Sequence, residues 1–188
     1  MVQGRTNVHC HEGDCNEVLL RDVFPRVRHD DFSGGGYKRA LCILDPYGLS
    51  LDWNVVAKAG SMGTFDILIN FPIYDININV LHRDRTTVLP IHADRMNAFW
   101  GNESWRDVAY EQSQGLFGVM EEKVSNERFA EAFRRRLREV AGFKRVPEPL
   151  PMRNSNNSVV YYLFFASQKN TAEHIIKYIF DKFGRGKG

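Results

Sequence analysis

ALCILDPYG, residues 40–48, and FDILINFP, residues 65–72, are the stretches that indicate the fold class. Each begins with a continuous apolar run, Ala40–Leu44 in the first and Phe65–Phe71 in the second, which is typical of a strand buried on both faces of a sheet. Between them, Leu51–Ala59 is predicted to be a helix, so the three segments form a strand–helix–strand unit. The two strands of such a unit lie parallel and next to each other. The sequence therefore predicts an α/β fold.

The segments on either side of this unit are also predicted to be regular. Upstream, Val8–His11 is a short strand candidate, Asn16–Arg28 is helical, and the turn-rich His29–Gly36 is a loop. Downstream lies a helical insert at about residues 75–125. Its expected helices are Ile76–Arg83, His92–Trp100 and Ser104–Gln112.

The last third of the chain is predicted to contain a helix, a hairpin and a second helix. The first helix follows Ser125, and Phe143–Met152 with Val159–Phe165 forms the hairpin. Prolines at every second position of residues 147–151 remove N–H donors from one side of the first strand, which places it at the edge of the sheet. Residues 172–183 carry an apolar stripe and form the last helix. The sheet is therefore expected to be mostly parallel and to end in an antiparallel hairpin.

The chain has 188 residues and a mass of 21.7 kDa, which predicts a single domain over residues 1–188. Its 43% hydrophobic content supports a sizeable core, and its longest apolar run, Val159–Ala166, is too short to cross a membrane. No apolar stretch near the N-terminus resembles a signal peptide. Three cysteines at irregular spacing, Cys10, Cys15 and Cys42, do not form a disulfide framework. A cytoplasmic protein is the simplest interpretation.

The net charge of +2 is too balanced to indicate nucleic-acid binding from the totals alone. Residues 126–153 nevertheless contain eight Arg or Lys and four Glu, a local charge of +4. Arg134 and Arg135 in this segment are candidate contacts for a nucleic-acid substrate. Helical arginines are more often part of a solvated surface, and both interpretations stay open.

A polar loop follows each predicted strand of the first half of the chain. The first is Glu12–Asn16, the second is Asp45–Gly48, and the third consists of Asn70, Phe71 and Pro72. Ligands of open α/β sheets bind at the carboxyl ends of the parallel strands. The three loops are therefore expected to meet at one edge of the sheet, where the residues of the third loop would contact the substrate.

The second loop carries the most informative motif, Asp45-Pro46-Tyr47-Gly48. It resembles motif IV of Rossmann-like methyltransferases that modify exocyclic amines of bases. The resemblance implies that the Asp45 carboxylate and the Pro46 carbonyl accept the N–H groups of an amine whose lone pair is delocalised into the ring. Tyr47 would stack on the base, and catalysis would consist mainly of alignment and charge complementarity. The same four residues also suit a plain turn, which is the alternative interpretation.

The first loop carries Gly13-Asp14, which resembles the methyltransferase motif whose acidic residue contacts the adenine of S-adenosylmethionine. Asp14 and the neighbouring Cys15 are therefore the expected cofactor contacts. The alternative is that Asp14 or Asn16 caps the helix that follows.

Four side chains of metal-ligand type lie near the N-terminus: His9, Cys10, His11 and Cys15. Successive residues of a strand point to opposite faces of a sheet, so these side chains do not converge. No metal site is expected.

Longer stretches extend the resemblance to nearly the whole chain. They are GDCNEVL, LDPYGLSLDW, LINFP, MNAFWGNESWRDVAY, EAFRRRLREVAGF and PMRNSNNSVVYYLFFAS. From about His11 to Phe183, they resemble the three-Cys-motif partner protein (TcmP) family, which is prokaryotic and phage-associated. The resemblance implies a Rossmann-like class I methyltransferase fold and methyl transfer from S-adenosylmethionine to a base amine in DNA or RNA. It also implies a neighbouring three-Cys-motif protein as a partner.

The chain departs from the family pattern at its N-terminal end. Family members begin with a strand and a glycine-rich turn that holds the methionine part of the cofactor, and a second strand ends in an acid that holds the ribose. This sequence contains neither, and its glycine cluster, Ser33–Gly36, precedes a strand instead of following one. The expected fold is therefore partial, without the first strands, and the chain is expected to be inactive alone.

The alternative function is that of a non-catalytic interaction protein, which binds a partner protein or nucleic acid. The missing cofactor elements favour this function, and the well-formed Asp-Pro-Tyr-Gly motif disfavours it. A sheet without its first strands also leaves an edge exposed, and exposed edges pair with other strands. The alternative therefore predicts a homo-oligomer.

Overall fold

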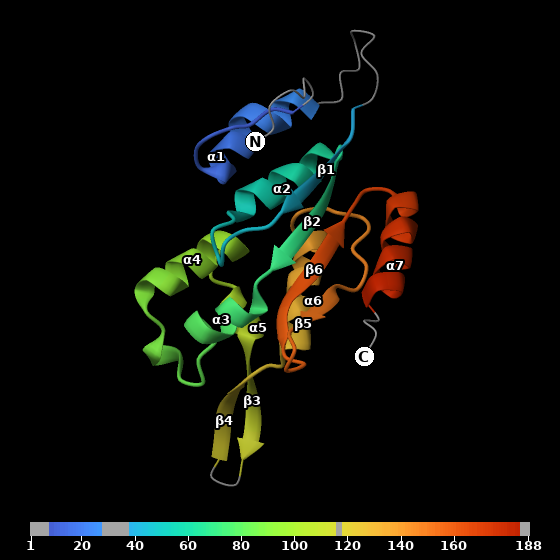
Figure 1. The fold of residues 1–188 in the computed structure, drawn as a ribbon. Helices are drawn as coiled ribbons and strands as arrows, with labels where there is room; N and C mark the ends of the chain where they lie inside the picture. Colours follow the sequence, from blue (N-terminus) through green and yellow to red (C-terminus); the bar gives the residue numbers. More distant parts are fainter. Residues whose placement is uncertain (1–7, 28–37, 116–117, 185–188) are drawn as a thin grey trace.

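The computed structural model describes residues 8–27, 38–115 and 118–184, and its main element is a four-stranded mixed sheet (Figure 1). In spatial order the strands are β1 (Ala40–Leu44), β2 (Phe65–Phe71), β6 (Val159–Ala166) and β5 (Leu150–Arg153). β1 is parallel to β2, and β6 is antiparallel to both β2 and β5. The predicted α/β class and the parallel β1–β2 pair are confirmed. The prediction of a mostly parallel sheet is wrong, because two of the three strand pairs described in this sheet are antiparallel.

Helices of the described residues lie on both faces of this sheet. In chain order they are α1 (Cys15–Val18), the π-helical turn η1 (Leu19–Val23), the 3-10 turn η2 (Phe24–Val27), α2 (Trp53–Met62), α3 (Ile73–Asn79), the 3-10 turn η3 (Arg85–Thr87), α4 (Pro90–Trp100), α5 (Trp105–Ala109), α6 (Asn126–Glu139) and α7 (Asn170–Gly184). α2 packs against β2 and α6 against β6, whereas α7 contacts β5 and β6 from the other side (Figure 1).

The side chains of β2 alternate between two environments, as the pleat of a strand requires. Those on one face are buried: Phe65, Ile67, Ile69 and Phe71. The ring centroids of Phe71 and Phe133 in α6 are 4.6 Å apart, so this face forms the core. The half-buried side chains of β2 point to the other face: Asp66, Leu68 and Asn70.

β1 lies at the edge of the sheet, and the prediction that it is buried on both faces is wrong. The side chains of Leu41 and Ile43 are 58% and 66% exposed. The strand predicted at Val8–His11 is not formed, and residues 8–12 are exposed. Val8 and Cys10 are the only apolar side chains of this segment, which is too small a face to hold it against a sheet. Within the described part of the chain, nothing pairs with the outer edge of β1.

The middle of the chain contains a hairpin where only helices were predicted. Its two strands are β3 (Tyr110–Gly115) and β4 (Gly118–Lys123). The helix expected over Ser104–Gln112 ends at Ala109, because the residues that follow are mostly polar and do not continue an apolar helical face. The hairpin projects from the body of the protein (Figure 1), and at its base the Tyr110 hydroxyl donates to the His82 carbonyl at 2.7 Å.

The C-terminal part confirms the predicted hairpin and helix. β5 pairs with β6 alone among the described strands, which confirms the edge strand, although it begins at Leu150 instead of Phe143. The predicted loop at His29–Gly36 lies outside the described residues. Where the structure describes the chain, no helix has the length and apolar character needed to span a membrane.

Candidate functional site

The three predicted loops meet at one edge of the sheet, and side-chain hydrogen bonds join them. Asn16, which is 7% exposed, donates from Nδ2 to the Ser50 carbonyl at 2.9 Å. Its Oδ1 accepts the Asp52 N–H at 2.9 Å. Asn70 Nδ2 donates to Asp45 Oδ1 at 2.7 Å. The expectation that these loops converge is confirmed.

Among the described residues, two cavities adjoin the loop of residues 45–48. The first, called the Asp45 cavity, has a volume of about 380 Å³. Its walls are mainly apolar and include Val18, Leu19, Ile43, Leu44, Pro46 and Leu51. The second, called the Tyr47 cavity, has a volume of about 440 Å³. Its walls carry more polar side chains than those of the first, and these include Asp14, Asn16, Asp52, Asp75, His92 and Arg95.

Asp45 provides a free acceptor at the mouth of the Asp45 cavity. Its Oδ1 is held by Asn70, whereas Oδ2 has no hydrogen-bond partner among the described residues. The Oδ1 atom of Asn70 is buried and also lacks a partner there. A carboxylate with one oxygen held and the other free can accept an N–H group of a ligand.

Tyr47 presents an almost bare aromatic ring, because its side chain is 97% exposed. The next residue, Gly48, has φ +58°, and a Cβ at this position would lie 3.1 Å from Asp75 Oδ2. Glycine is therefore required for this turn, which leaves the Tyr47 ring at the Tyr47 cavity. An exposed ring of this kind is a stacking surface for a planar ligand.

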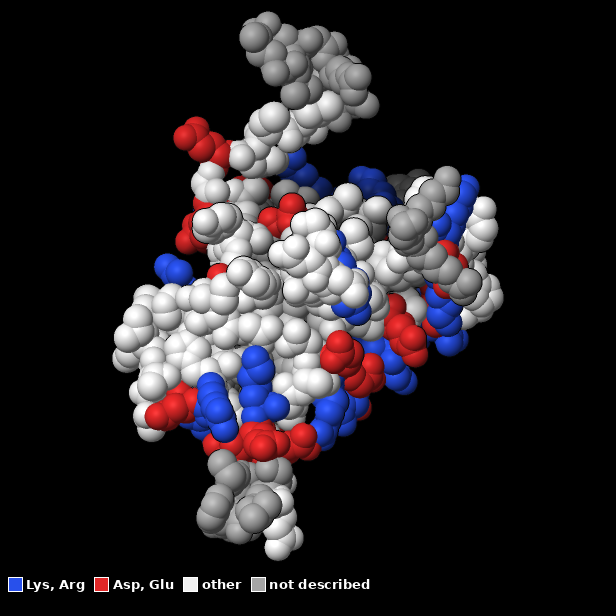
Figure 2. Space-filling view, turned by 60° about the horizontal axis from the view of Figure 1, so that its bottom comes forward, with Lys and Arg blue, Asp and Glu red and all other residues white. Residues whose placement is uncertain are grey.

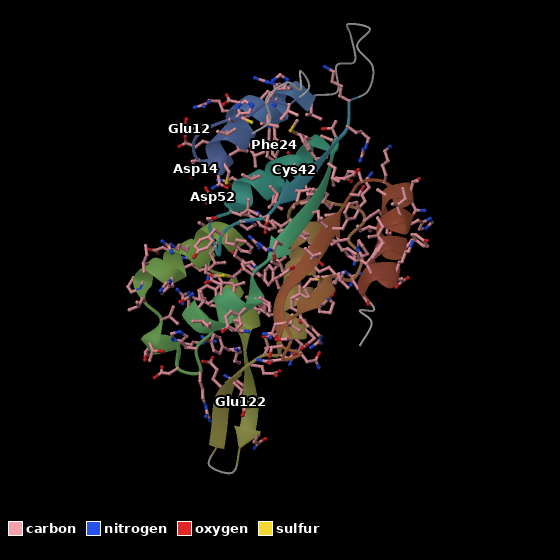
Figure 3. All side chains as sticks on the ribbon, viewed as in Figure 1. Glu12, Asp14, Phe24, Cys42, Asp52 and Glu122 are labelled. Carbon is pink, nitrogen blue, oxygen red and sulfur yellow. The ribbon has the colours of Figure 1, made fainter. Side chains whose placement is uncertain are left out.

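One wall of the Tyr47 cavity is acidic, and its three carboxylates lie at the N-terminal ends of helices. Asp14 caps α1 by accepting the N–H groups of Asn16 at 2.8 Å and Glu17 at 3.2 Å. Asp52 occupies the N-cap position of α2, and Asp75 lies in the first turn of α3. Figure 3 shows Asp14 and Asp52 together beside α1 and α2. The partial positive charge of a helix N-terminus offsets part of the charge of each carboxylate.

Another wall of the Tyr47 cavity comes from α4. His92 and Arg95 are three residues apart, so they extend from the same side of this helix toward the cavity. Neither side chain has a hydrogen-bond or ion-pair partner among the described residues. Neither was predicted as a site residue, although their helical spacing gave a signal that both share one face.

Of the third loop, only Asn70 reaches the site as predicted. Phe71 is 0% exposed and lies in the core, so its assignment as a substrate contact is wrong. The alternation of β2 that directs Asn70 to the loops directs the next side chain into the core. Pro72 is half-buried at the N-cap position of α3.

Arg134 and Arg135 lie on α6 and line pockets other than the two described above. Arg134 donates from Nε to the Val146 carbonyl at 2.8 Å and pairs with Glu131 at 3.1 Å. On the face drawn in Figure 2, Lys and Arg side chains are interspersed with Asp and Glu among the residues described. This arrangement suits the solvated-surface interpretation better than a continuous basic surface for phosphates.

The described residues do not fit S-adenosylmethionine. Asp14, the expected adenine contact, uses Oδ1 to cap α1, which confirms the capping alternative and leaves Oδ2 as its remaining acceptor. Cys15 lines the Asp45 cavity, so the two expected cofactor contacts belong to different cavities. No glycine-rich turn follows a strand within the described residues, and Ser33–Gly36 lies outside them. The methionine and ribose parts of the cofactor thus have no holding groups in the described chain.

In the described ranges, no three side chains of His, Cys, Asp or Glu are placed to hold a metal ion together. Comparison with family models, curated proteins and solved structures gives no match. The resemblance to TcmP proteins therefore stays a prediction from the sequence segments.

Proposed function

We propose that the Asp45 cavity binds a nucleobase and holds its exocyclic amine for methyl transfer. The chain is then the target-binding part of a Rossmann-like class I methyltransferase that acts on nucleic acid, as the resemblance to TcmP proteins implies. S-Adenosylmethionine, the methyl donor implied by the same resemblance, requires groups that the described residues do not supply. The observation that carries the proposal is the free Oδ2 of Asp45 beside an apolar cavity of about 380 Å³.

The chemistry follows from the acceptors of the second loop. The flat ring of a base suits the apolar walls, and its amine donates one N–H to Asp45 Oδ2 and the other to the Pro46 carbonyl. Two accepted N–H bonds draw the amine nitrogen toward a tetrahedral shape and restore part of its lone pair for attack. Asn70 fixes the Asp45 carboxylate for this task. Tyr47 lines the other cavity, so we assign the target amine to Asp45 and Pro46 alone.

Calorimetric titration with paired nucleosides tests the proposal. Cytidine and adenosine carry an exocyclic amine, whereas uridine and inosine carry a carbonyl at the same position. We expect the amine-bearing member of each pair to bind about tenfold more tightly, because one hydrogen bond to a charged acceptor is worth about 1.5 kcal/mol or more. The variant Asp45→Ala should lose this preference.

The matched control is Asp94→Ala, which removes an exposed aspartate of α4 that is absent from the walls of both cavities. This variant should keep the full preference for the amine. Equal binding of amine and carbonyl nucleosides to the unmodified chain would overturn the proposal, as would a preference that survives in Asp45→Ala.

The open edge of β1 favours a second candidate function, that of a non-catalytic interaction protein. Leu41 and Ile43 are 58% and 66% exposed on a strand whose outer edge pairs with nothing in the described residues. Such an edge accepts a strand from another chain. The predicted occupant is a second copy, because the exposed apolar side chains of Leu41 and Ile43 on one β1 would cover those on another.

Light scattering with two lysine variants tests this second candidate. We expect a dimer for the unmodified chain and a monomer for Ile43→Lys, because the lysine would bring two positive charges into an apolar contact. Ile91→Lys is the control, since Ile91 is 54% exposed on α4. A clean monomer of the unmodified chain would refute pairing of two copies through β1.

A further inference from the structure

We infer that the Tyr47 cavity is a second nucleotide subsite, so that the ligand is a single-stranded segment of at least two nucleotides and not a free nucleoside. The inference rests on the proposed function, because it takes the Asp45 cavity as the position of the target base. It adds the side chains that hold the neighbouring nucleotide: Tyr47, Arg95 and His92.

The two cavities are close enough to serve neighbouring nucleotides. Pro46 lines the Asp45 cavity and Tyr47, the next residue, lines the Tyr47 cavity. Consecutive Cα atoms lie about 3.8 Å apart, so the two cavities are separated by the thickness of one loop. Bases of a single strand can be splayed apart and held separately, whereas those of a duplex cannot. The loop of residues 45–48 would pass between two such bases.

Tyr47 supplies the surface on which the neighbouring base stacks. Its ring is 97% exposed, so stacking does not require displacement of another side chain. Stacking on an aromatic ring accepts any base, because every base has a π-face, and its loss typically weakens single-strand binding about fivefold to a hundredfold. The volume of about 440 Å³ is sufficient for a base and part of its sugar.

Arg95 and His92 supply the contact for the phosphate that links the two nucleotides. Arg95 is exposed at the cavity and has no ion-pair partner among the described residues, so its guanidinium is available to a phosphodiester. His92 lies in the first turn of α4, where the partial positive charge of the helix N-terminus also favours an anion.

The acidic wall does not oppose this arrangement. Asp14, Asp52 and Asp75 each lie at a helix N-terminus, which offsets part of their charge. Their oxygens are acceptors, and the groups of a nucleotide that suit acceptors are base N–H groups and sugar hydroxyls. The base and sugar therefore face the acidic wall, and the phosphate faces α4.

Calorimetry with cytidine and with the dinucleotides CpU and UpC, in ribose and deoxyribose forms, tests the subsite. We expect at least one dinucleotide to bind about tenfold more tightly than cytidine. Arg95→Gln should reduce this gain at least threefold and leave the affinity for cytidine unchanged, and Tyr47→Ala should also reduce the gain at least threefold. Both side chains are exposed, so their replacement leaves the core intact. A gain confined to the ribose or the deoxyribose series identifies RNA or DNA as the source of the ligand.

The control is Arg138→Gln, which removes the same charge from an exposed position on α6 and should keep the gain. If dinucleotides bind no more tightly than cytidine, or if Arg95→Gln keeps the full gain, the subsite is refuted while the amine preference at Asp45 still stands. If the dinucleotide gain and its dependence on Arg95 persist without any preference for cytidine over uridine, the proposed function fails and the subsite is retained.

Discussion

Replacing Asn16 with alanine perturbs the contact that joins the first two loops of the site. The variant loses the bonds of Nδ2 to the Ser50 carbonyl and of Oδ1 to the Asp52 N–H, both 2.9 Å long. Each bond contributes about 1 kcal/mol net, and the two backbone groups left without partners add about 1–2 kcal/mol. We therefore expect the free energy of unfolding to fall by about 3–4 kcal/mol. This loss is a large part of the stability of a domain.

Urea unfolding followed by tryptophan fluorescence measures this change. Asn156→Ala is the matched control, because Asn156 is an exposed residue of the turn between β5 and β6, and its replacement should cost less than about 0.5 kcal/mol. The loops of Asn16→Ala should also lose their fixed positions, which weakens binding of cytidine. If the two variants unfold at the same urea concentration, the side chain of Asn16 does not hold the loops together, and the argument for a converged site fails.

Three further predictions concern the core and the cysteines. Gly60→Ala should lower the free energy of unfolding by about 2–4 kcal/mol, because the added Cβ would lie 1.9 Å from the Ala141 carbonyl oxygen. Thermal unfolding measures this loss, and an unchanged midpoint temperature would contradict the close packing of Gly60 against Ala141. Burial raises the pKa of the Cys42 thiol to about 11. A thiol reagent at pH 8 should therefore label the exposed Cys10 and Cys15 rapidly and Cys42 slowly. Equal labelling rates for the three cysteines would argue against the burial of Cys42. The unfolded thiol ionises near its ordinary pKa of 9.0, so the stability due to the raised pKa is present below pH 9 and is lost as the pH rises toward 11. Denaturation at several pH values should therefore show a smaller loss of stability over this interval for Cys42→Ala than for the unmodified chain.

The fold was predictable where short-range patterns determine it. The apolar runs at Ala40–Leu44 and Phe65–Phe71 identify the parallel pair, and the prolines of residues 147–151 identify an edge strand. The exposure of β1 was not predictable, because the same apolar run suits a buried strand and its exposure depends on whether another strand lies beside it. The β3–β4 hairpin was missed because its largely polar sequence shows no alternation of apolar residues.

The site was predictable in its position and less so in its members. The rule that ligands bind at the carboxyl ends of parallel strands identified the loop that contains both Asp45 and Tyr47. Phe71 was assigned wrongly because the alternation along β2 was not applied to neighbouring residues. Arg95 was missed because its place in the wall of the Tyr47 cavity depends on where α4 lies relative to the loops, and residue spacing within one helix does not contain that information. The bond from Asn16 to the Ser50 carbonyl spans 34 residues and is likewise a product of the tertiary fold.

Mapping of backbone NMR shifts during titration with cytidine tests the central claim most directly. A nucleobase held at the free Oδ2 of Asp45 should shift the amide signals of residues 13–16, 43–51 and Asn70, and these changes should saturate together. Saturating shifts confined to α6 and β5, or no shifts at concentrations that saturate the calorimetric signal, would contradict the claim that these loops form a nucleobase site.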